Sequence, residues 1–145
     1  MLETGACGLN AITANSDFIF MGFTMCSEQD GCVLQIYNYD YEKIKSLHLG
    51  ISQIYTDISL CINDAYLVGS HVEGYVSVIS LETDAIEIVE KPFGEVDTIW
   101  AAEVIPFRPD GEPQQLLMPT NCGLFSCILT EEGNFYFMMQ SHFLD

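Results

Sequence analysis

The residues that could do chemistry are few and form no recognisable catalytic pattern. The three histidines, the usual general bases at neutral pH, stand far apart at positions 48, 71 and 142. His71 and Glu73 make an acid–base-capable pair, but no nucleophile or metal-ligand motif accompanies them. Segment 38–42 alternates oxygen-bearing side chains as a calcium loop does at its start, yet it lacks the glycine and the distal glutamate. We therefore predict a protein that is not an enzyme and uses no cofactor or metal ion.

Six cysteines could in principle form disulfides or hold zinc. They lie at positions 7, 26, 32, 61, 122 and 127, and none is in the C-x-x-C spacing of a zinc ribbon. Most fall within apolar runs, where a free thiol behaves as a small hydrophobic side chain. The first residues lack the basic-then-apolar layout of a signal peptide. We expect reduced, buried cysteines and an intracellular location, in the cytoplasm or the nucleus.

The chain is strongly acidic, with 21 acidic residues against 4 basic ones and a formal net charge of −17. This charge repels phosphate backbones and anionic lipid, so we expect neither nucleic acid nor a membrane as partner. It favours basic segments of other proteins and keeps a chain with 49% hydrophobic residues in solution.

The elements that would position these residues are strands. Short runs rich in Ile, Val, Phe and Tyr, with period-2 alternation, recur between Gly, Asn, Asp and Pro, and helical periodicity is almost absent. The sequence therefore predicts an all-β chain. Its only tryptophan, Trp100, lies in one of the apolar runs, which favours a packed core position.

A pair of strand-like runs occurs three times along the chain, at 17–22 with 34–39, at 64–69 with 76–81, and at 115–120 with 125–130. Another run precedes each pair, at 8–14, 54–62 and 99–107, and a fourth follows it, at 42–49, 85–90 and 134–140. Four short strands in roughly 40–50 residues are typical of a β-propeller blade. We predict blades at about 6–50, 51–91 and 95–143, within a single unit of 1–145.

Short motifs in these repeats carry a family resemblance, most clearly in the second unit. Residues 73–74 (Glu-Gly), 79–80 (Ile-Ser) and 81–83 (Leu-Glu-Thr) stand where a repeat would have Asp-Gly, Trp-Asp and a Leu-x-Thr turn, and the first unit keeps Asp30-Gly31. This order resembles the repeat of the WD40 β-propeller superfamily. No unit has the Gly-His dipeptide of a standard repeat, so the resemblance is to a degenerate, WD40-like partial propeller of about three four-stranded antiparallel blades.

The resemblance implies a non-catalytic protein–protein interaction scaffold that acts as a subunit of a multiprotein complex. Propellers close with about four to eight blades, so we expect a further propeller portion, or a second copy, to close the ring. The loops where propellers usually bind would form an acidic rim that recruits basic segments. The candidate partner-binding residues are Glu28, Asp30, His71, Glu73, Glu95 and Asp97.

Three alternatives remain open on sequence alone. The first is an unrelated fold, a β-sandwich whose strands happen to recur. The second is a fragment of a propeller enzyme whose active site lies partly on missing blades. The third is a small β-sandwich or barrel that acts as a ligand-binding module and would be a compact monomer.

Overall fold

The computed structural model describes residues 6–25 and 31–141, and these ranges form twelve strands without a helix. None of their segments is therefore a helix that could cross a membrane. The strands make three four-stranded antiparallel sheets, each with its strands side by side in chain order.

The first sheet, blade one, contains β1 (Ala6–Ala14), β2 (Ile19–Met25), β3 (Cys32–Tyr37) and β4 (Lys43–His48). Blade two contains β5 (Tyr55–Cys61), β6 (Tyr66–His71), β7 (Val76–Ser80) and β8 (Ile86–Val89). Blade three contains β9 (Glu103–Val104), β10 (Gln114–Thr120), β11 (Gly123–Leu129) and β12 (Phe135–Ser141).

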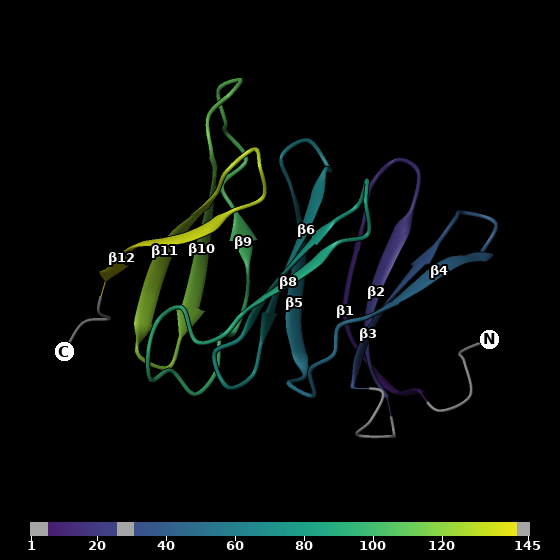
Figure 1. Ribbon diagram of the computed structural model, residues 1–145, viewed down its shortest axis with the longest axis horizontal. Coiled ribbons are helices and arrows are strands. Elements are labelled where there is room, and N and C mark those ends of the chain that lie inside the picture. The colour runs from purple at the N-terminus through teal and green to yellow at the C-terminus, as the bar shows by residue number, and fades with distance from the viewer. Residues whose placement is uncertain (1–5, 26–30, 142–145) are drawn as a thin grey trace.

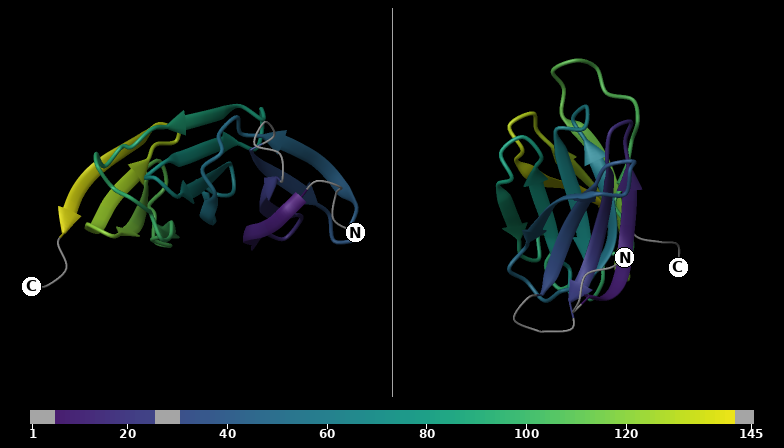
Figure 2. Two further views of the ribbon diagram at one scale, coloured as in Figure 1. Left: turned by 90° about the horizontal axis from the view of Figure 1, so that it is seen from below. Right: turned by 90° about the vertical axis from the view of Figure 1, so that its right-hand side faces the viewer.

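The three blades follow one another along a curved row (Figure 1). Figure 2 shows the curve in its left-hand view, with blades one and three at opposite ends of the row. The first strands of neighbouring blades contact each other, β1 with β5 and β5 with β9. The all-β class and the partial propeller are thus confirmed. Three successive sheets do not form the two facing sheets of a β-sandwich.

The blades pack against each other because apolar side chains alternate along the strands and gather on the faces that meet. Residues two apart face the same side of a sheet, and on β3 this places Leu34 and Ile36 against blade two, where they meet Leu67 and Ile79. A second cluster closes the seam between blades two and three, where Val78 and its neighbours contact residues of β10 and β11. Two apolar seams therefore join three sheets.

The seam between blades one and two depends on two glycines, which have no side chain, beside the ring of Tyr55. Tyr55 lies in it, 2% exposed. A Cβ placed on Gly22 would lie 2.7 Å from Cδ2 of Tyr55, and one on Gly69 would lie 2.5 Å from both Cε1 of Tyr55 and Oγ of Ser77. Any larger residue at these two positions would clash with the Tyr55 ring and force the seam to rearrange.

The first strand of blade three is much shorter than the predicted run, 99–107. Only Glu103–Val104 forms a ladder with β10, preceded by an isolated bridge from Ile99 to Thr120. Part of this segment bonds to side chains of β5 instead. The N–H of Ala102 donates to Oδ2 of Asp57 at 3.0 Å, and the Thr56 hydroxyl donates to the Ile99 carbonyl at 2.6 Å. These bonds join blade three to blade two and interrupt the strand.

We expect Gly69→Ala to lower the free energy of unfolding by about 1–3 kcal/mol, because the new methyl group overpacks a closed seam. Gly8→Ala is the matched control, since a Cβ there meets nothing within 4 Å, and it should change stability by less than about 0.5 kcal/mol. Thermal or urea denaturation followed by circular dichroism measures both. Equal stabilities of the two variants would contradict the conclusion that Gly69 is needed to leave room for the ring of Tyr55.

Candidate functional site

The loop that connects blade two to blade three is clamped between two turns. The N–H of Glu73, in the turn between β6 and β7, donates to the Asp97 carbonyl at 2.6 Å. On the other side, Oδ1 of Asn121 accepts the N–H of Asp97 at 3.0 Å. A Cβ on Gly74 would lie 2.9 Å from the Val96 carbonyl, which shows how closely the backbones approach. The loop is thus held by both blades.

This clamp brings together three of the acidic residues predicted for the rim. Glu73, Glu95 and Asp97 are all exposed, and together they define the acidic rim of the described chain. Glu73 also accepts a hydrogen bond from Nε2 of Gln53 at 2.8 Å. Two further predicted residues, Glu28 and Asp30, lie outside the described residues.

His71 does not present its side chain on the rim, because it is completely buried beneath it. Its Nδ1 lies 2.9 Å from the Gln53 carbonyl, its Nε2 lies 2.8 Å from Oγ of Ser77, and its ring stacks on Tyr55 with centroids 4.4 Å apart. Burial lowers the pKa of His71 from 6.5 to about 4. The neutral ring thus donates from Nδ1 to the carbonyl and accepts the Ser77 hydroxyl at Nε2. In this structure the side chain supports the fold and is inaccessible to a partner.

The thiols of the core are unreactive. Cys32, Cys61 and Cys127 are buried and free, and burial raises the pKa of their thiols to about 11, 12 and 12. Cys122 is also free and is exposed. No three His, Cys, Asp or Glu side chains converge as metal ligands within the described ranges.

Trp100 is 60% exposed, so its predicted core position is wrong. Its backbone N–H donates to the Pro119 carbonyl at 2.8 Å. The adjacent Ile99, completely buried, occupies the seam. Because successive side chains of an extended segment point in opposite directions, the indole of Trp100 faces solvent.

Blade three has an apolar face that no described residue covers, here called the open face. Tyr136, Met138 and Met139 of β12 are 51%, 59% and 60% exposed, and Ile128 of β11 is half-buried beside them. A cavity of about 450 Å³ on this face is lined by Phe107, Ile128 and Met138 with prolines of the preceding loop. β12 is also the outer edge of the sheet, and none of its seven residues is charged or proline.

The opposite end of the row is different. On blade one, Phe23 and Val33 are paired neighbours on β2 and β3, and they alternate with the residues that face blade two. They therefore point away from blade two, yet they are 0% and 1% exposed. Gln35, on the same face, is also completely buried. The outer face of blade one is therefore closed at these three positions, whereas Leu9 and Ile12, which pair with Phe23 and Met21 on the same face, are 47% and 55% exposed.

We expect the buried His71 to make stability depend on pH. In the unfolded chain His71 is protonated as the pH falls below about 6.5, whereas in the folded chain it stays neutral until about pH 4. The stability that the buried, neutral ring contributes is therefore fully present above pH 6.5 and is lost as the pH falls from 6.5 to 4. The loss reaches about 3 kcal/mol. Urea denaturation of His71→Gln between pH 4 and 7 should lack this slope, whereas His48→Gln, at an exposed position, should keep it. A His71→Gln variant with an unchanged slope would contradict the assignment.

No protein-family model matches the chain, and neither does any curated protein. Among solved structures, the chain is similar to the β-propeller domain of Cps50 (Swd1) from Myceliophteria thermophila, with a TM-score of 0.65 and 18% identity. This match covers 95% of the chain but 39% of that domain. The chain is also similar to the computationally designed Ika4 protein, with a TM-score of 0.52, 10% identity and 92% of each chain covered. The chain therefore has the fold of part of a β-propeller, built from three blades.

Proposed function

We propose that the chain is a non-catalytic protein-interaction scaffold, a propeller segment that acts as a subunit of a multiprotein complex in the cytoplasm or nucleus. The open face of blade three is the observation that carries this proposal. Its exposed methionines and Tyr136 stand at the position where blades one and two each pack against a neighbour. Contiguous apolar surface of this kind marks a protein interface. The free, buried thiols support the intracellular location.

The cover of the open face is a further propeller portion and not a second copy of the chain. A second copy would offer the outer face of its own blade one, where Phe23 and Val33 are already buried although Leu9 and Ile12 are exposed. Two chains with a formal net charge of −17 would also repel each other. A blade with neutral or basic flanks has neither disadvantage.

The acidic rim is the proposed site for basic segments of a partner. Glu73, Glu95 and Asp97 lie on turns that are held by backbone bonds, so binding costs little ordering of the loop. Exposed carboxylates attract Lys and Arg at long range and discriminate against acidic partners.

Met139 is replaced by a photo-cross-linking amino acid in the full protein, which is expressed in its source cells. We expect this residue to form cross-links to strand segments of a propeller blade. The same residue at Thr83, which is exposed on a turn of blade two, is the control and should not give these products. Mass spectrometry identifies the cross-linked peptides. Cross-links from Met139 only to a second copy of the chain, or to no protein, would overturn the proposed cover.

Charge reversal tests the rim. We expect Glu73→Lys with Asp97→Lys to weaken binding of a fluorescent Arg- and Lys-rich peptide by about fivefold to tenfold, because attraction is replaced by repulsion. Glu82→Lys with Glu132→Lys changes the net charge equally on exposed turns elsewhere and should have a smaller effect. Fluorescence anisotropy at two salt concentrations gives the affinities. If both double variants weaken binding equally, the rim has no special role.

A further inference from the structure

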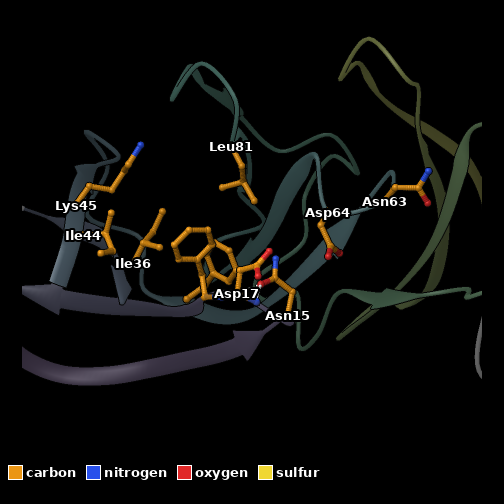
Figure 3. Close-up of a pocket in the computed structure, with 10 residues that line it drawn as sticks. Asn15, Asp17, Ile36, Ile44, Lys45, Asn63, Asp64 and Leu81 are labelled. Carbon is orange, nitrogen blue, oxygen red and sulfur yellow. Dashed lines mark hydrogen bonds between the residues drawn. The ribbon is translucent and has the colours of Figure 1, made fainter. Parts of the chain in front are cut away.

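A third surface feature lies between blades one and two, at the ends of the strands opposite the rim. A cavity of about 480 Å³, here called the groove, opens between the turn that joins β1 to β2 and the turn that joins β5 to β6. Its apolar lining consists of Phe18, Phe20, Ile36, Ile44 and Leu81. Figure 3 shows Asp17 and Asp64 on the sides of the groove contributed by these turns.

The charge of the groove is unbalanced. Lys45 lines it, but Nζ of Lys45 lies 3.0 Å from both carboxylate oxygens of Asp84, so this cation is already neutralised. The carboxylates of Asp17 and Asp64 have no ion pair or side-chain hydrogen bond within the described part of the chain, and both residues are exposed. The free charge in the groove is therefore negative.

The first turn holds Asp17 firmly. Oδ1 of Asn15 accepts the backbone N–H groups of Asp17 and Phe18 at 2.9 and 2.8 Å. The Tyr39 hydroxyl donates to the Asn15 carbonyl at 2.6 Å, from the turn after β3. These contacts fix the backbone of the turn that carries Asp17 beside the groove.

The second turn holds Asp64 at a conformational cost. Ile62, Asn63 and Asp64 have φ angles of 53°, 52° and 66°, a region that β-branched residues such as isoleucine rarely adopt. Gln114 of blade three supports the turn, because its Oε1 accepts the Ile62 N–H at 3.3 Å. The neighbouring blade therefore stabilises the conformation that places Asp64 at the groove.

The apolar lining is only partly covered. Phe18 is 37% exposed and Ile44 is 47% exposed, whereas Phe20 below them is 2% exposed. A ligand that complements the groove must bury an apolar side chain on Phe18 and Ile44 and bring a cation to the two carboxylates. A second copy of the chain, with its net charge of −17, lacks the required complementarity.

We propose that the groove docks a short segment of a partner protein in which apolar side chains adjoin a Lys or Arg. The proposal rests on the scaffold function in general, but it uses neither the open face nor the acidic rim. The apolar side chain fills the groove, and the cation pairs with Asp17 and Asp64. The backbone of the segment crosses from blade one to blade two.

The test uses the whole chain and a labelled synthetic peptide with Leu-Arg-Leu between Gly-Ser spacers. We expect saturable binding by fluorescence anisotropy, and shifts in NMR spectra at the two turns and at Ile44. Asp17→Asn with Asp64→Asn should weaken binding about tenfold, and so should replacement of the peptide's Arg by Glu. Glu103→Gln with Asp110→Asn, exposed on blade three, is the charge-matched control and should weaken binding less than twofold.

Three outcomes would overturn the proposal: equal weakening by both double variants, equal binding of the Arg and Glu peptides, or NMR shifts confined to the open face. Ile44→Ser tests the apolar half separately, and unchanged affinity would also contradict it. Circular dichroism confirms that each variant is folded. Because the cross-linking test at Met139 reports on blade three alone, a failure there would leave these results unaffected, and the reverse also holds.

Discussion

Packing of one sheet face against the next is the interaction on which the structure depends. A four-stranded antiparallel sheet of this size buries little by itself, and each blade becomes stable by sharing a face with its neighbour. At the seam between blades one and two, Gly22 and Gly69 leave room for the ring of Tyr55. His71 stacks on that ring and hydrogen-bonds through both of its nitrogens. The same packing leaves an apolar surface wherever a neighbour is missing.

Much of the fold could be predicted because period-2 alternation and turn residues are local signals. The three units of strands, and the acidic turns with Glu73 and Asp97, follow from them. What could not be predicted depends on contacts between blades. The first strand of blade three is interrupted because Asp57, distant in sequence, accepts the N–H of Ala102. Trp100 is exposed for a related reason, since its neighbour Ile99 occupies the seam.

In the candidate sites, too, local sequence signals were predictive and contacts between distant residues were not. His71 was predicted for the rim from its place at a strand end, but its burial depends on Tyr55, Ser77 and Gln53 together. Asp17 and Asp64 begin two of the predicted strand runs, 17–22 and 64–69, and nothing in a single sequence indicates that the ends of strands from different blades border one cavity. The surfaces of the chain thus differ in chemistry: an acidic rim, a groove with carboxylates around an apolar lining, and the apolar open face.

The bare edge of β12 has a consequence for the life of the protein in the cell. A strand with unpaired N–H and C=O groups, and without charges or proline to protect it, is a template for any other extended chain. Copies that meet through this edge would therefore be prone to add strands to one another and to aggregate.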